Sequence, residues 1–284
     1  MRHEHDDGEQ AVGVRYYATD EGGPSESIGG IMGTATTASP IRREPELLGQ
    51  TVVVIGGSAG IGLETARRAR AEGAKLILTG RNSEPLHRAA RELNALSTAA
   101  FDAADPAQLE QFFRDLPATI DHVMVTAGRP HYGRLVDMDF AEARRALEEH
   151  LLLVIQVARN AAPKVRPEGT LLFMGGTGAR RPGIGLGIAS TVTAALPALT
   201  ANLALELAPV RVNLIAAGFV DTPLSASLLG AELENRRNQL RATLPIRRVV
   251  APADVAALAV HIMTNTALTG ATYDVDGGQQ LVAR

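Results

Sequence analysis

A glycine-rich heptapeptide is the first stretch of this sequence whose residue types and spacing could do chemistry. Residues 56–62 read GGSAGIG. In such a turn the first glycine permits a sharp bend, the second lets the backbone approach a diphosphate, and the third lets the following helix pack closely. The free N–H groups at the start of that helix would face the phosphates. The stretch predicts a dinucleotide site formed by Gly56, Ser58, Ala59, Gly60, Ile61 and Gly62.

The type of dinucleotide is indicated by the residues that follow the next apolar run. NAD-binding folds usually place Asp or Glu about 20 residues beyond the glycines, where the carboxylate bonds the ribose 2′-OH. Here the stretch TGRN has Arg81 and Asn82 and no carboxylate. An arginine can make a charge-assisted, bidentate contact with a 2′-phosphate. The alternative is a solvated surface arginine, and the sequence favours NADP(H).

The elements that must position this turn follow from alternating apolar runs and helical patterns after residue 50. Strands are predicted in 51–55, 75–79, 122–128, 170–176, 211–218 and 271–278. Helices are predicted in 62–73, after a cap at Ser83, and from Asp105-Pro106, where the proline suits a first turn. Apolar strands between helices indicate a parallel sheet covered on both faces. We expect a single, doubly wound α/β domain in three layers, with ligands at the carboxyl ends of its strands.

Residues 1–45 differ from the rest of the chain. They are rich in Gly, Ser, Thr and acidic residues and show no helical or strand period. Such a segment buries too little apolar surface to offset its ordering entropy. We therefore expect a flexible N-terminal tail before a domain at 46–284. His3 and His5 are expected to be solvated, and no metal site is predicted.

Composition excludes several classes of function. The chain has no cysteine, which rules out disulfides and thiolate catalysis. Its net charge of −3 is spread along the sequence, so nothing suggests a surface for nucleic acid. The apolar run at 151–157 is far shorter than the ~20 residues that span a bilayer, and the acidic N-terminus lacks the features of a signal peptide. We expect a cytoplasmic protein with a small-molecule substrate and no nucleic-acid or membrane partner.

With these features in place, residues 48–284 resemble the short-chain dehydrogenase/reductase superfamily. The matching stretches are GGSAGIG, LTGRN, FDAAD, TAG at 126–128, LALELAPVRVNLIAAGFVDTPL and VDGG. The resemblance implies a Rossmann-type domain, an NAD(P) site and a homodimer or homotetramer. It also implies further cofactor contacts, from Asp102 and Ala103 at the adenine, from Ala127 and Gly128, and from Ala217, Gly218, Val220 and Thr222 near the nicotinamide and diphosphate.

The catalytic residues of that family do not carry over to this chain. In the family a tyrosine transfers the substrate proton, and a lysine four residues later holds the ribose and lowers the tyrosine's pKa. These positions correspond to Ala189 and Thr193 in GIASTVT, and the family's serine and asparagine correspond to Gly176 and His150. Thr193 could still bond a ribose hydroxyl. The only lysines are Lys75 and Lys164, and the only tyrosines are Tyr16, Tyr17, Tyr132 and Tyr273.

Few residues could replace the missing acid. His150 can titrate near neutral pH, although a lone helical histidine is commonly packed or capped. His131 and Tyr132 follow the predicted strand at 122–128 on a loop at the carboxyl edge, where function concentrates. Thr177, Arg180 and Arg181 follow the predicted strand at 170–176 and could bind an anionic substrate.

Two functions are compatible with these residues. One is an NADP(H)-dependent oxidoreductase with a non-standard active site, acting on an activated substrate such as an iminium or a conjugated acceptor, because hydride transfer belongs to the cofactor. The other is a catalytically silent NADP(H)-binding sensor or scaffold. A lyase or isomerase has no positive evidence among the residues.

Overall fold

The computed structural model describes residues 44–117 and 119–282. The predicted tail, apart from residues 44 and 45, lies outside the described residues. The described chain forms a seven-stranded sheet whose strands all pair in parallel. Its strands are β1 (Thr51–Ile55), β2 (Lys75–Gly80), β3 (Ser97–Ala100), β4 (Ile120–Val125), β5 (Val165–Gly176), β6 (Arg211–Ala217) and β7 (Thr272–Val275).

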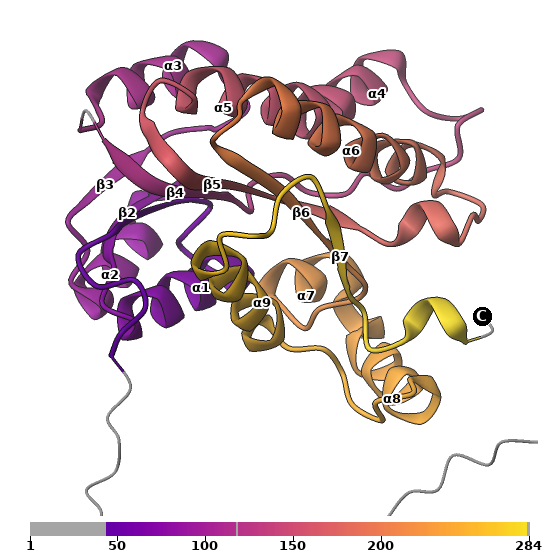
Figure 1. The fold of residues 1–284 in the computed structure, drawn as a ribbon. Coiled ribbons are helices and arrows are strands. Elements are labelled where there is room, and N and C mark those ends of the chain that lie inside the picture. Colours follow the sequence, from indigo (N-terminus) through magenta and orange to yellow (C-terminus); the bar gives the residue numbers. More distant parts are fainter. Residues whose placement is uncertain (1–43, 118, 283–284) are drawn as a thin grey trace, which may run out of the picture. The chain divides into compact units, whose positions relative to one another are not determined.

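The strand order is β3-β2-β1-β4-β5-β6-β7, which places the point where the winding reverses between β1 and β4 (Figure 1). Ligands bind doubly wound sheets at such a point, outside the carboxyl ends of the strands. The predicted parallel, doubly wound α/β fold is therefore confirmed.

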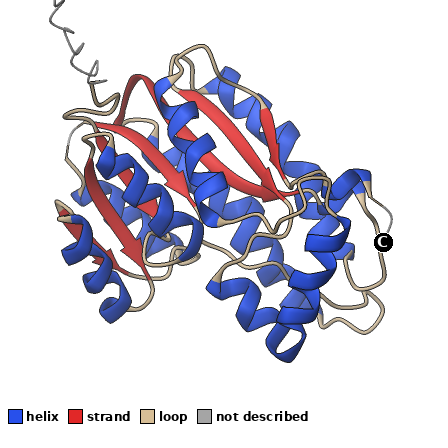
Figure 2. Cartoon of the chain, turned by 90° about the horizontal axis from the view of Figure 1, so that it is seen from below, coloured by secondary structure: helices blue, strands red, loops and turns tan. Residues whose placement is uncertain are grey.

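Helices cover both faces of the sheet. The helices are α1 (Gly60–Ala71), α2 (Ser83–Leu93), α3 (Pro106–Asp115), α4 (Phe140–Leu147), α5 (Leu153–Ala161), α6 (Gly187–Glu206), α7 (Pro223–Leu229), α8 (Leu233–Thr243) and α9 (Pro252–Thr264). One face carries α3 to α6 and the other carries α1, α2 and α9, which Figure 2 shows in front of the strands. This arrangement gives the expected three layers.

The two-residue period of the strands explains why there are two cores. On β1, Val53 and Ile55 belong to the hydrophobic cluster that includes residues of α3, α5 and α6. Val52 and Val54 belong to the cluster that includes residues of α1, α2 and α9. Successive side chains point to opposite faces of a sheet, so a strand that is apolar throughout contributes side chains to both hydrophobic cores.

Two local predictions need correction. The strand β3 was missed, because its sequence STAA is short and half-exposed and has no apolar run. Ser83 is the first residue of α2 and not its cap; the cap position is Asn82, and its side chain makes no capping bond. Asp105, in contrast, caps α3 as expected, since its carboxylate accepts from the backbone N–H groups of Ala107 and Gln108.

Within the described residues, α6 is the one helix that is long and apolar enough to cross a membrane, judged by length and composition alone. Such a helix is weak evidence for a span, because core helices pass the same test. Here Val192, Leu196 and Leu203 are buried in the core next to the sheet.

Candidate cofactor site and active site

The turn after β1 has the geometry that its glycines predict. Gly56 has φ +96°, and a β-carbon there would lie 2.6 Å from Thr126 Oγ1. A β-carbon on Gly62 would lie 2.2 Å from the carbonyl oxygen of Gly56, so only glycine lets α1 pack on the turn. Gly60 has φ +53° and lies against Thr222, whose Cγ2 would be 3.5 Å from a β-carbon.

The start of α1 leaves its backbone N–H groups available. The cap residue, Ala59, has no side chain that could accept from them, and Gly60, Ile61, Gly62 and Leu63 provide no acidic group. Helix N-termini with free N–H groups favour phosphate. The site residues Gly56 to Gly62 thus form one turn at the carboxyl edge of the sheet, as the sequence predicts.

The end of β2 lies beside this turn. Thr79 O accepts hydrogen bonds from the N–H groups of Gly56 and Gly57, at 3.2 and 2.9 Å. A β-carbon on Gly80 would lie 2.9 Å from Ser58 Oγ. Arg81 and Asn82 follow directly and are exposed, and Arg81 makes no hydrogen bond or ion pair within residues 44–117 and 119–282. Within the described residues the exposed Arg81 side chain has no partner, and its backbone follows directly on Gly80, which packs against the turn.

The ends of β3 and β4 complete this side of the site. Phe101 N donates to Gly80 O at 3.1 Å, which brings Asp102 and the buried Ala103 next to the end of β2. The Asp102 carboxylate accepts from Ala104 N. After β4, Ala127 N donates to Ile55 O at 3.1 Å. The predicted cofactor residues on four strands therefore meet at one edge.

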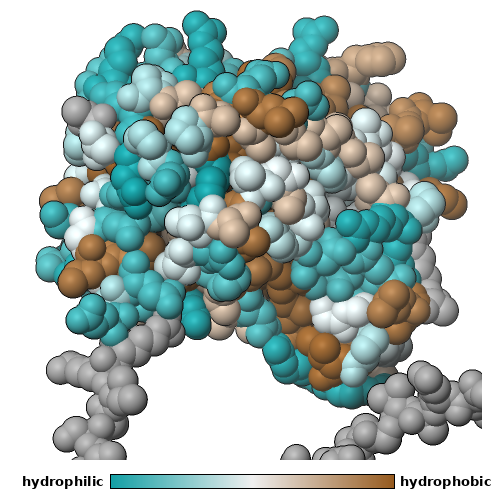
Figure 3. Space-filling model, in the orientation of Figure 1, coloured by the Kyte–Doolittle hydropathy of each residue, from teal (hydrophilic) through white to brown (hydrophobic). Residues whose placement is uncertain are grey.

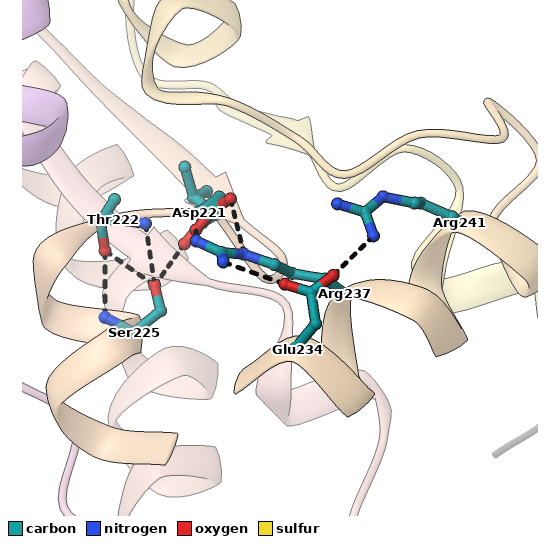
Figure 4. Close-up of polar contacts among 7 residues, drawn as sticks. Asp221, Thr222, Ser225, Glu234, Arg237 and Arg241 are labelled. Carbon is teal, nitrogen blue, oxygen red and sulfur yellow. Dashed lines mark hydrogen bonds and ion pairs between the residues drawn. The ribbon is translucent and has the colours of Figure 1, made fainter. Parts of the chain in front are cut away.

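The loop after β6 closes over the same edge. A β-carbon on Gly218 would lie 2.7 Å from Gln279 Oε1, so this turn packs tightly although the residue before it is Ala217 and not proline. Val220 is buried and pairs with Val250. Thr222 caps α7: its Oγ1 accepts from Ser225 N at 3.1 Å (Figure 4).

The start of α6, where the resemblance would place a tyrosine and a lysine, contains neither. Thr193 Oγ1 donates to the carbonyl oxygens of Ala189 and Ser190, so its hydroxyl proton is engaged within the helix. A β-carbon on Gly176 would lie 3.2 Å from Thr193 Cγ2. Lys164 donates to the carbonyl oxygens of Arg114 and Leu116, and Lys75 is the first residue of β2. Both lysines thus lie where strands begin, at the opposite edge of the sheet.

His150 lies next to the cofactor edge within a π-helical turn, Glu148–Leu152. Such turns are rare and are frequent at functional sites. Its Nδ1 is 3.0 Å from Ala146 O, so we assign the proton to Nδ1, and Nε2 faces Gly128. Burial lowers the pKa of His150, more than the bond to Ala146 raises it. The ring is therefore neutral near pH 7 and presents an acceptor.

The other two predicted catalytic residues differ in their surroundings. His131 Nε2 lies 3.1 Å from Glu149 Oε2, and the rings of His131 and His150 are 6.3 Å apart, edge to face. Glu149 was not among the predicted residues, because a pair 18 residues apart leaves no local signal. Tyr132 is 55% exposed, and partial burial raises its pKa, so nothing around it makes it more acidic.

A cavity of about 20 Å³ lies beside His150, between α5, α6 and the ends of β4 and β5. This is enough for about one water molecule and too small for an organic substrate. Arg180 pairs with Asp274 and donates to Gln280 Oε1, so its charge is already matched. In the part of the chain that the structure describes, no group of three or more His, Asp or Glu side chains is placed to hold a metal ion.

Comparisons with known proteins assign the family. The family model described as enoyl-(acyl carrier protein) reductase matches residues 56–280. With this match, the parallel sheet and the glycine turn, the chain belongs to the short-chain dehydrogenase/reductase superfamily.

Individual relatives match the chain over nearly their whole length. A short-chain dehydrogenase/reductase of Stachybotrys chlorohalonatus is 28% identical and covers 82% of this chain and 98% of its own length. The 4-formylbenzenesulfonate dehydrogenase of Comamonas testosteroni is 31% identical, covering 82% and 98%. The crystal structure of a short-chain dehydrogenase from Burkholderia cenocepacia in complex with NADP has a TM-score of 0.74 at 28% identity, covering 82% and 98%.

Proposed function

We propose that this chain is an NADP(H)-dependent oxidoreductase with a non-standard active site, acting on a small molecule that arrives already activated. The observation that carries the cofactor assignment is Arg81, which follows β2 beside the turn at residues 56–62, is exposed and has no partner among the described residues, with no carboxylate at that place. A related protein has been crystallised with NADP, which supports the same assignment.

The residues present fit the cofactor. Gly56, Gly60 and Gly62 give it a close-packed turn, Arg81 would hold a 2′-phosphate, and Asp102 and Ala103 would border the adenine. The loop of Val220 and Thr222 would close on the other half of the dinucleotide. When bound, the nicotinamide supplies hydride transfer, and the protein supplies position and electrostatics.

The substrate class follows from the missing proton donor. The positions of the family's serine, tyrosine and lysine are Gly176, Ala189 and Thr193, and none of these side chains can donate to a developing alkoxide as tyrosine would. His150 is neutral and presents Nε2 as an acceptor. A conjugated acceptor or an iminium depends less on proton donation by the protein than a simple ketone does, because the carbon that accepts the hydride is already electron-poor.

The missing proton donor also favours a second candidate function. A protein that keeps the dinucleotide turn but loses its acid could serve as an NADP(H)-binding sensor or scaffold. The two candidates share the cofactor and differ only in turnover. For either, we propose a cytoplasmic homodimer or homotetramer in which residues 1–45 are dispensable for the domain.

The test is to titrate NADPH and then follow its oxidation with a panel of simple ketones, enones and imines. The oxidoreductase proposal predicts tight NADPH binding with turnover of enones or imines. NADPH binding without turnover of any class would favour the sensor, and failure to bind NADPH would contradict both.

A further inference from the structure

Two arginines and a phenylalanine lie together at the carboxyl edge of the sheet, and of these only Arg181 was among the residues named from the sequence. Phe219 follows β6, Arg181 follows β5, and Arg236 comes from α8. All three are half-buried. Three elements far apart in the sequence thus contribute to one cluster.

Gln279 holds two members of this cluster. Its side-chain oxygen accepts from Phe219 N at 2.8 Å, and its backbone carbonyl oxygen accepts from Arg181 Nη1 at 2.6 Å. The C-terminal segment therefore ties the loop after β6 to the loop after β5. Both loops border the predicted cofactor edge, since Gly218 and Val220 flank Phe219.

Arg236 covers the phenylalanine. Its guanidinium carbon is 5.9 Å from the centre of the Phe219 ring, and Nη1 donates to Gln239 Oε1 at 2.6 Å. A cation over an aromatic face is attracted by the ring quadrupole. Phe219 thus fixes the position of the Arg236 guanidinium.

The helix that carries Arg236 is anchored by its neighbour. Arg237 makes a two-pronged ion pair with Asp221, with Nη2–Oδ1 at 2.7 Å and Nε–Oδ2 at 3.0 Å (Figure 4). Glu234 also pairs with Arg237, at 3.2 Å. Because Asp221 lies two residues after Phe219, this pair locks α8 to the loop that Arg236 covers.

The charge of Arg236 is not matched. Within the described part of the chain no carboxylate pairs with Arg236, whereas neighbouring Arg180 has Asp274 and Arg237 has Asp221. Burial lowers the pKa of Arg236, and the positive charge of Arg181 lowers it further. A half-buried guanidinium that has no carboxylate partner costs free energy unless an anion offsets its charge.

We propose that Arg236, held over Phe219, binds an oxyanion of the substrate, a carboxylate or a phosphate. This inference rests on the proposed function, since it names the class of molecule that the oxidoreductase would accept. A guanidinium offers two parallel N–H donors that match the oxygen pair of a carboxylate or phosphate. Arg236 would thus select substrates that carry an acidic group.

The experiment measures ligand binding to the NADP⁺-loaded protein by calorimetry at low ionic strength. The probes are benzoate, benzamide and phenyl phosphate, of which benzamide has the shape of benzoate without the charge. We expect an anionic probe to bind roughly tenfold or more tightly than benzamide, the scale of one charge-assisted contact. The tighter of benzoate and phenyl phosphate identifies the oxyanion.

The variants separate a local contact from general charge. Arg236→Gln should weaken binding of the anionic probe by roughly tenfold or more. Arg241→Gln, on the same helix and half-exposed, removes the same charge and should leave probe binding unchanged. If Arg236→Gln does not fold, Arg236→Lys is the second variant. It keeps the positive charge but loses the two parallel N–H donors of the guanidinium, and it should still weaken binding of the anionic probe.

Equal binding of benzoate, phenyl phosphate and benzamide to the native protein would overturn the oxyanion site while NADP⁺ binding stands. Equal losses of anionic-probe binding in Arg236→Gln and Arg241→Gln would also overturn the oxyanion site. Absence of NADP⁺ binding would instead overturn the proposed function, and the probes could still be measured on the cofactor-free protein.

Discussion

Gly62 of α1 lies directly against Gly56 of the turn that precedes it: a β-carbon on Gly62 would be 2.2 Å from the Gly56 carbonyl oxygen. The obstacle is backbone and cannot rotate away. The close approach of helix and turn therefore depends on the absence of one methyl group.

Gly62→Ala should consequently destabilise the domain and abolish tight NADPH binding. Overpacking costs about 1–3 kcal/mol, and here it would also push α1 away from the diphosphate turn. Urea unfolding and NADPH titration measure the two effects. Gly178→Ala is the control, because a β-carbon there has only one ordinary contact, at 3.5 Å. Native-like stability of Gly62→Ala would contradict the packing argument.

Arg81 should set the preference between cofactors. The native protein should bind NADPH more tightly than NADH, and Arg81→Ala should reduce that difference by about 1.5–3 kcal/mol, the value of a hydrogen bond to a charged group. Arg88→Ala, on the helix that follows Arg81, removes an arginine paired with Glu84 at an exposed position and should leave the preference intact. Equal calorimetric affinities of the native protein for the two cofactors would show that Arg81 is merely a solvated side chain.

His122 should make the domain sensitive to mild acid. Burial lowers its pKa from 6.5 to about 3, and its Nε2 is bonded to Gln50 Oε1 at 2.8 Å. Below pH 6.5 His122 binds a proton in the unfolded chain but stays neutral in the folded chain. Its contribution to the free energy of unfolding is therefore fully present above pH 6.5 and is lost as the pH falls toward 3. One such group contributes a slope of about 1.4 kcal/mol per pH unit.

Urea unfolding at several pH values between about 7.5 and 5 would measure this slope. His122→Gln removes the titrating group and should flatten the profile by roughly one proton. His87→Gln, an exposed position on α2, is the control and should keep the native slope. Identical slopes in the native protein and His122→Gln would contradict the prediction.

The sequence predicts those features that depend on local pattern. The apolar period places β1, β2 and β4 to β7, and the spacing of Gly56, Gly60 and Gly62 predicts the turn. Asp105-Pro106 predicts the start of α3 because a cap acts within three residues. The sequence does not predict the half-exposed β3, because its four small residues show no hydrophobic period.

Contacts between distant residues leave no such pattern. Glu149 meets His131, and Arg236 meets Phe219, only because packing of the helices on the sheet brings their elements together. The orientation of the His150 ring is set by Ala146 one turn earlier, which a sequence without coordinates does not reveal. These are the residues that determine what the site could do.

The outer faces of α5 and α6 should form an interface between copies of this chain. Leu152 directly before α5, Ile155 on α5 and Leu205 on α6 are 44%, 45% and 80% exposed, and apolar side chains gather at the surface over these helices (Figure 3). Exposed apolar patches commonly mark interfaces. Light scattering should give a dimer or tetramer that Leu205→Glu dissociates. Leu96→Glu, also at an exposed leucine, should not; a stable native monomer at micromolar concentration would refute the interface.

The last prediction concerns the missing acid. If His150 replaced the family's tyrosine, His150→Phe should slow reduction of simple ketones by about 10²–10⁴-fold, the usual contribution of general acid catalysis, with NADPH affinity intact. We expect otherwise. Burial keeps the His150 ring neutral, its proton is on the nitrogen bonded to Ala146, and the nitrogen facing Gly128 has none to give.

The native protein should therefore already be slow on unactivated ketones, and His150→Phe should change its rates with enones or imines by less than about tenfold, since hydride transfer to an activated acceptor needs no strong protein acid. Steady-state rates for a ketone and an enone of matched size, in the native protein and the variant, test both statements. His131→Phe is the control variant, because it removes the imidazole next to His150 and leaves His150 itself in place. Rapid turnover of a simple ketone that His150→Phe abolishes would show that the histidine supplies the proton after all.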